Sequence, residues 1–174
     1  MQLKERVIST ALILILNIIL QSTLFQAIRI VNIMPNTSII IIVSYALLRG
    51  RTEGAAVGCF SGILTDIFFG TSFGFYAFLG MMTGYICGRS FHNLYRENYI
   101  LPIMISSAAV FIYENIIYFT GFLFKGNTEY FYFLIHLIIP EMVYTGVFSI
   151  IIYRLLFAVN DWLEQREKYR YRLF

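Results

Sequence analysis

Long apolar runs separated by short polar connections dominate the chain. A helix rises about 1.5 Å per residue, so about 20 apolar residues cross a hydrocarbon core of about 30 Å. The pattern therefore predicts an all-α polytopic membrane protein, with six transmembrane helices in a compact bundle and a single domain over residues 1–174. The predicted helices cover 7–28, 34–48, 54–69, 73–88, 99–124 and 130–159, and residues 160–174 form a tail.

Two prolines and one polar turn refine these predictions. Pro35 suits the first turn of the second helix, where its missing N–H is harmless. The polar stretch 49–54 is predicted to be a tight turn before the third helix, which is short for a membrane crossing. Pro140 lies inside the sixth run and is expected to kink that helix.

The basic residues predict the orientation of the bundle. Lys and Arg near helix ends favour the cytoplasmic side. With the N-terminus inside, only Arg29 and Lys125 lie outside, and the C-terminus is also cytoplasmic. The residues placed inside are Lys4, Arg6, Arg49, Arg51, Arg89, Arg96, Arg154, Arg166, Lys168, Arg170 and Arg172. The tail, which contains Trp162, Tyr169 and Tyr171, is expected to lie at the inner membrane surface.

Composition supports the membrane prediction and excludes other classes. The chain is 59% hydrophobic and 13% charged, whereas soluble domains carry about 25% charged residues. The net charge of +3 is spread between the apolar runs, so nucleic-acid binding is not indicated. Cys59 and Cys87 lie in apolar runs without CxxC spacing, which favours a packing role. No catalytic motif is found, so no catalytic residue, metal or cofactor is predicted.

Small residues recur every fourth position in the third and fourth runs. On a helix this spacing makes a stripe that lets another helix approach closely, as in GxxxG motifs. The two stripes either pack against each other or leave a groove for a partner. Their members are Gly54, Gly58, Gly62, Asp66 and Gly70 in the third run, and Gly80, Gly84 and Gly88 in the fourth.

Asp66 interrupts the first stripe with a carboxylate, at about 2.5 to 3.5 kcal/mol on membrane-insertion scales. Helix termination or loop anchoring and a proton relay both remain open for it. The other polar residues inside apolar runs are expected to form interhelical hydrogen bonds. They are Asn17, Gln21, Glu114, Asn115, His136 and Glu141. Asn17 and Gln21 share a helix face that should turn into the bundle.

Three stretches resemble the central Gly-rich region of the MreD rod-shape-determining family. They are RGRTEGAAVG at 49–58, GILTD at 62–66 and GTSFGFYA at 70–77. The resemblance implies a non-enzymatic scaffold in the bacterial cytoplasmic membrane, within the cell-elongation machinery (elongasome). Its partners would be membrane lipids and an MreC-like bitopic protein, with RodA, a class B penicillin-binding transpeptidase and MreB as further components of lateral peptidoglycan synthesis.

The same family is similar in fold to the substrate-binding subunits of energy-coupling-factor vitamin transporters. A small-molecule-binding transporter subunit is therefore the alternative function. A binding subunit should present a closed pocket lined by polar and aromatic groups, with Asp66, Glu114, His136 and Glu141 as the candidates. A scaffold should instead offer an apolar surface to a partner.

Overall fold

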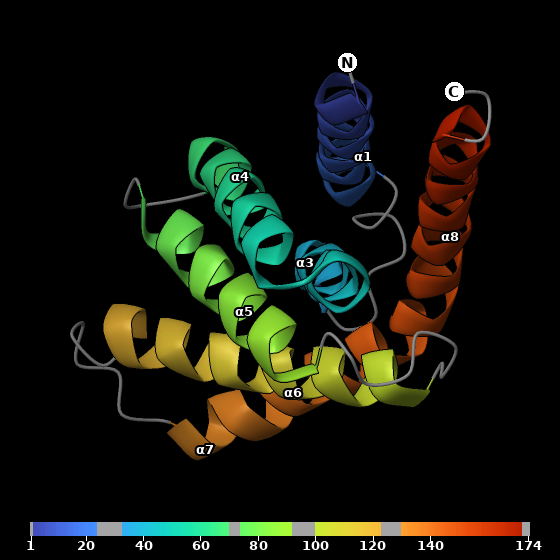
Figure 1. Cartoon of the computed structure of the whole chain (residues 1–174). Helices are drawn as coiled ribbons and strands as arrows, with labels where there is room; N and C mark the ends of the chain where they lie inside the picture. The colour runs from blue at the N-terminus through green and yellow to red at the C-terminus, as the bar shows by residue number, and fades with distance from the viewer. Residues whose placement is uncertain (1, 24–32, 70–73, 92–99, 123–129, 172–174) are drawn as a thin grey trace.

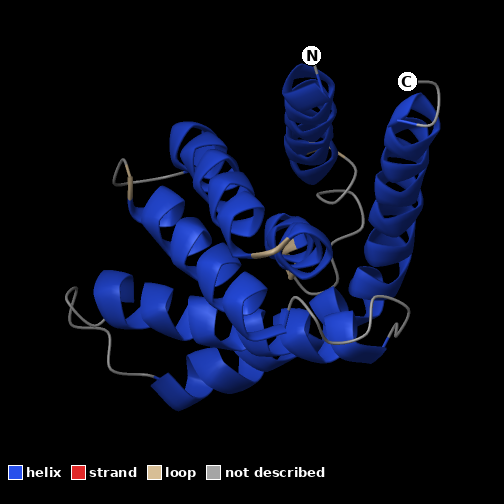
Figure 2. Ribbon diagram, viewed as in Figure 1, coloured by secondary structure: helices blue, strands red, loops and turns tan. Residues whose placement is uncertain are grey.

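The computed structural model describes residues 2–23, 33–69, 74–91, 100–122 and 130–171. All regular structure in these ranges is helical, which confirms the all-α prediction, and six helices are formed (Figure 2). They are α1 (Gln2–Ser22), α3 (Thr37–Arg49), α4 (Arg51–Phe69), α5 (Phe75–Phe91), α6 (Ile100–Ile117) with the π-helix η1 (Tyr118–Phe122), and α7 (Tyr130–Phe133) with the π-helix η3 (Leu134–Ile138) and α8 (Ile139–Tyr171).

Helix α3 is the centre of the bundle. Every side chain from Thr37 to Leu48 is buried, and α3 contacts α1, α4, α5, α6 and α8 (Figure 1). A helix that is hydrophobic all round belongs in a core, and the run of four isoleucines at 39–42 gives α3 that character. The second apolar run is therefore short because it is enclosed by protein.

The turn between α3 and α4 is one residue long. Gly50 has φ 88°, a conformation that favours glycine, and its N–H donates to the Ala46 carbonyl at 3.0 Å. Arg51, Thr52 and Glu53 consequently form the first turn of α4. The predicted helix start at 54 was wrong, because Gly50 alone reverses the chain and the polar residues that follow it are free to be helical.

The last helix differs from its prediction at both the proline and the end. Proline lacks an N–H, and its ring clashes with the carbonyl four residues earlier, here that of His136. The π-helix η3 places a wider turn at this point, with the Ile139 N–H bonded to the Leu134 carbonyl. The helix then continues to Tyr171, so the predicted boundary at 159 was wrong and most of the tail is part of α8.

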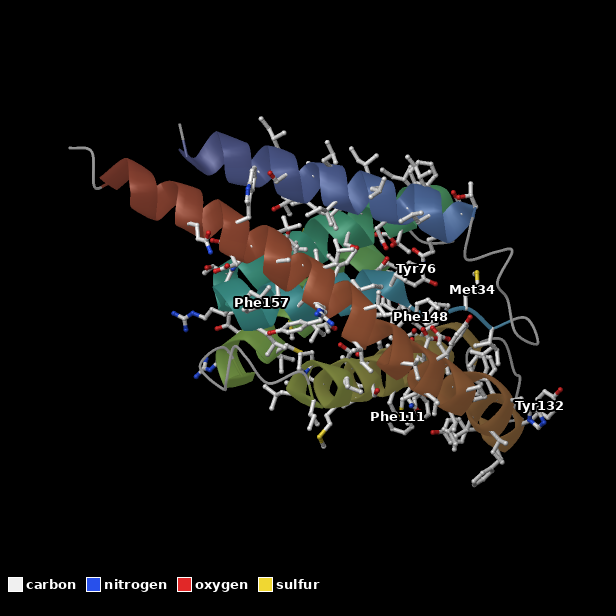
Figure 3. The ribbon with its side chains drawn as sticks, turned by 90° about the vertical axis from the view of Figure 1, so that its right-hand side faces the viewer. Met34, Tyr76, Phe111, Tyr132, Phe148 and Phe157 are labelled. Atoms are coloured by element: carbon white, nitrogen blue, oxygen red, sulfur yellow. The ribbon has the colours of Figure 1, made fainter. Side chains whose placement is uncertain are left out.

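Two helical segments, Ile100–Gly121 and Tyr130–Trp162, are long and apolar enough to cross a membrane. Only 33% and 28% of their most apolar windows are buried, so most of their apolar side chains face outward. Large apolar side chains are also exposed on α1, α4 and α5. The first turn of α1 and the last turn of α8 lie at the same end of the molecule (Figures 1 and 3).

Candidate functional site

The glycines of α4 and α5 face each other along an antiparallel pair of helices (Figure 1). A Cβ on Gly58 would collide with the Gly80 carbonyl, and one on Gly84 would collide with the Gly54 carbonyl. These pairs show that the two backbones are in direct contact, because no side chain separates them. The stripes are occupied by one another and leave no open groove between the two helices.

The same contact extends along both helices. A Cβ on Gly62 would meet the backbone of Tyr76 and Ala77, and one on Gly88 would lie 2.6 Å from the Arg51 Cα. Gly70, the last member of the first predicted stripe, lies outside the described residues. The glycine contact between α4 and α5 therefore runs from the first turn of α4 to the first turns of α5.

Asp66 anchors the beginning of α5. Its Oδ2 accepts hydrogen bonds from the backbone N–H groups of Gly74 at 3.0 Å and Ala77 at 3.1 Å, and its Oδ1 accepts from Tyr76 at 3.1 Å. The first N–H groups of a helix lack intrahelical partners, and here a carboxylate from the neighbouring helix supplies them. Asp66 is 5% exposed. The geometry matches the loop-anchoring interpretation of Asp66.

A second buried carboxylate cluster surrounds the first turn of α3. Asn36 caps that helix, with its Oδ1 accepting from the Ile39 N–H at 3.3 Å. The same side chain hydrogen-bonds to Glu114 of α6 and Glu141 of α8. The Asn36 N–H donates to Thr145 Oγ1 at 3.0 Å. Glu114 is buried and Glu141 half-buried, so three helices converge on one residue.

The remaining predicted polar residues do not join this cluster. Asn17 donates to Ser38 Oγ at 3.2 Å, and Ser38 donates to Gln21 Oε1 at 3.2 Å, which ties α1 to α3. Asn115 accepts from the Tyr130 hydroxyl at 2.7 Å. His136 is exposed and stacks on Tyr132 with ring centroids 4.3 Å apart. Figure 3 shows Tyr132 projecting away from the bundle.

Nothing in this arrangement assembles the groups of a hydrolase or a transition-metal centre. Within the described ranges, no three His, Cys, Asp or Glu side chains gather where they could hold a metal ion. Cys59 and Cys87 are free thiols on neighbouring helices. The arranged groups serve helix packing and helix capping.

The family model described as rod shape-determining protein MreD matches residues 3–160. The chain belongs to the MreD family. No curated protein and no solved structure shows a significant match to the chain. MreD proteins are membrane-associated and determine rod shape together with the MreB and MreC machinery, and MreD is not a family of enzymes.

One polar centre of this MreD chain was missed by the sequence reasoning, which used Arg49 only as a marker of topology. The Arg49 side chain is 8% exposed and bonds to Glu53 Oε2 at 3.2 Å. Its Nε donates to Asn160 Oδ1 at 2.7 Å, and its guanidinium lies 5.2 Å from the centre of the Tyr45 ring. The i,i+4 spacing of Arg49 and Glu53 was a usable signal, whereas Asn160 was too distant in sequence to find.

Asn36 was also missed as a functional residue of this MreD chain. An asparagine directly before an apolar helix is a standard N-cap signal, so its capping role was predictable. Its bonds to Glu114 and Glu141 were not, because those residues lie far along the chain on two other helices.

Proposed function

We propose that this MreD protein is a non-enzymatic membrane scaffold of the bacterial cell-elongation machinery. It binds an MreC-like bitopic partner and thereby supports rod shape and lateral peptidoglycan synthesis. The observation that carries the proposal is the internal fastening of the bundle, by backbone contact between α4 and α5, by Asp66 and by Arg49. A preorganised bundle can hold a partner helix at low conformational cost.

In this proposal the chain crosses the cytoplasmic membrane six times with both termini in the cytoplasm. The eleven-to-two distribution of Lys and Arg supports this orientation. The ends of α1 and α8 lie on the same side of the bundle, as an even number of crossings requires. The Arg49 end of α3 then faces the cytoplasm, and the Asn36 end faces outward.

The partner helix docks on an outward apolar face in this scheme. The glycine stripes are not available, since α4 and α5 cover each other's glycines. Apolar side chains face outward from α1, α4, α5, α6 and α8, and helices in lipid associate through fit rather than through exclusion of water. RodA, the class B transpeptidase and MreB would then be connected to the bundle through the assembled complex.

A scan with a photo-crosslinking amino acid tests this docking. One exposed position on each helix is replaced in turn: Ile15, Phe60, Met82, Ile112 and Ile151. We expect crosslinks to an MreC-like protein in native membranes from one helix or two adjacent helices only. Crosslinks from all five positions, or from none in cells that contain the partner, would contradict specific docking.

The vitamin-transporter alternative draws support from the polar cluster of Asn36, Glu114 and Glu141 inside the bundle. Depletion in a rod-shaped host separates the two functions. The scaffold proposal expects rounded cells and unchanged vitamin uptake. Normal rods with reduced uptake would favour the transporter subunit and remove the scaffold proposal.

A further inference from the structure

A file of fully buried hydroxyl groups lines the interface of α3, α6 and α8. The side chains of Thr37, Ser44, Ser106, Thr145 and Ser149 are each at most 1% exposed. The three helices contact one another in every pair. Thr145 and Ser149 follow Glu141 at four-residue steps on α8, and Ser106 lies two turns from Glu114 on α6, so these hydroxyls share helix faces with the two glutamates.

Two printed contacts fix the register of α3 against α8. Asn36 bonds to Thr145 at one end of α3, and Arg49 bonds to Asn160 at the other, so the helices run side by side in the same direction. Thr37 shares its face of α3 with Ile41, which packs in one cluster with Leu156 of α8. The Thr37 hydroxyl therefore lies toward α8, near Thr145 and one turn from Glu141.

Of the side chains that the structure describes, two fully buried hydroxyl oxygens have no hydrogen-bond partner. They are Thr37 Oγ1 and Ser106 Oγ. Buried polar atoms are almost always satisfied by protein, water or an ion. Thr37 Oγ1 is the one that adjoins the glutamate cluster, and an oxygen without a partner is a suitable ligand for a positive ion.

The two glutamates require positive charge at the same place. Both bond to the side chain of Asn36, so their nearest oxygens are at most about 6 Å apart, which is two hydrogen-bond lengths. A neutral amide does not compensate two buried carboxylates that repel each other. Carboxylate and hydroxyl oxygens are the ligands of hard cations rather than of soft transition metals.

We propose that Glu114, Glu141 and Thr37 Oγ1 bind a hard metal cation at the Asn36 end of the bundle. Ca²⁺ is the ion whose charge balances the two carboxylates, and waters complete its coordination in the hydroxyl-lined file. The cation fastens α3, α6 and α8 together where Arg49 cannot reach. The site does not depend on partner docking, and its test uses the isolated protein.

Thermal unfolding of the full-length protein in detergent tests the site. Protein freed of metals with a chelator is melted in choline chloride, and Ca²⁺, Mg²⁺ or Na⁺ is then titrated. We expect a saturable rise of the melting midpoint with Ca²⁺. Glu114→Gln and Glu141→Gln should abolish this rise and should melt above the cation-free wild type, because each removes one repelling charge.

Two further variants separate ion binding from general effects. Thr37→Val keeps the shape and all charges, and we expect it to weaken the half-saturating Ca²⁺ concentration by roughly tenfold. Asp161→Asn removes an exposed carboxylate at the opposite end of α8 and should respond to Ca²⁺ as the wild type does.

A direct count of bound ions keeps the proposal testable if a glutamine variant does not accumulate. Equilibrium dialysis of the wild type should find about one Ca²⁺ per chain, and fewer for Thr37→Val at the same concentration. A saturable response to Na⁺ in place of Ca²⁺, lost in the same variants, would retain the site and reassign its ion. Identical melting with and without every cation, or an unchanged shift in Glu114→Gln, would overturn it.

Discussion

Gly58→Ala is the most direct test of the contact between α4 and α5. The added methyl group would collide with the Gly80 carbonyl and lie 3.0 Å from the Met81 nitrogen. These are backbone atoms of a helix, so they cannot rotate away as a flexible side chain would, and the two helices must separate. Overpacking of this kind destabilises by about 1 to 3 kcal/mol, and separation also removes contacts along both helices.

An opposing effect must be subtracted from that loss. Alanine favours a helix over glycine by about 1 kcal/mol, so the net destabilisation expected for Gly58→Ala is about 1 to 2 kcal/mol. Gly58→Leu should exceed it, because a larger side chain pushes the helices further apart. Gly62→Ala should behave as Gly58→Ala does, since its Cβ would meet the backbone of Ala77.

Gly121→Ala is the matched control. A Cβ at Gly121 would meet nothing within 4 Å, so only the helix preference of alanine acts there. Denaturant titration in detergent, followed by circular dichroism, measures the free energy of unfolding of each variant. We expect Gly121→Ala to be neutral or slightly stabilising. If Gly58→Ala and Gly121→Ala gave equal free energies of unfolding, the backbone contact between α4 and α5 would be refuted.

Three further predictions concern the anchors and the topology. Asp66→Asn should lose about 1 to 2 kcal/mol, because its amide NH₂ cannot accept the bonds made by one carboxylate oxygen, whereas Asp66→Leu loses all three bonds and should accumulate poorly; equal accumulation of both with equal loss of function would show that the charge itself is needed. Arg49→Met should leave Asn160 without its bond, at about 1 to 3 kcal/mol, and should speed hydrogen exchange in the last turns of α8, whereas unchanged exchange would show that α8 is held elsewhere. A reporter that is active only outside the cytoplasm should signal when fused at Lys125 and stay silent after Phe174, and activity at the second fusion would contradict six crossings.

The sequence predicted the helical runs because long apolar segments have few alternatives in a membrane. It also contained the central position of α3, since a helix with isoleucines on every face has no polar side to present. The start of α4 was misplaced because a turn of one glycine leaves no polar loop to recognise. The continuation of α8 to Tyr171 was missed because its apolar pattern stops before its backbone does.

The pairing of polar residues was beyond a single sequence. Asn17 and Gln21 lie on one helix face, so their inward direction follows from spacing alone. Glu114, Glu141 and Asn36 come from three helices that are distant in sequence, and nothing in their local patterns places them together. The glycine stripes fall between these cases: spacing predicts close helix contact, while the identity of the contacting helix is a property of the fold.

The enclosure of α3 has a consequence for the biogenesis of the protein. Synthesis of the 122 residues between Arg49 and Tyr171 takes roughly 6 to 24 s at about 5 to 20 residues per second. During that time α3 has left the ribosome without the full set of helices that cover it, and its buried hydroxyls lack the surroundings that α6 and α8 supply. Chains that end before α8 should therefore expose a half-covered central helix to lipid and become substrates for membrane proteases, which makes the last helix a checkpoint for the whole chain.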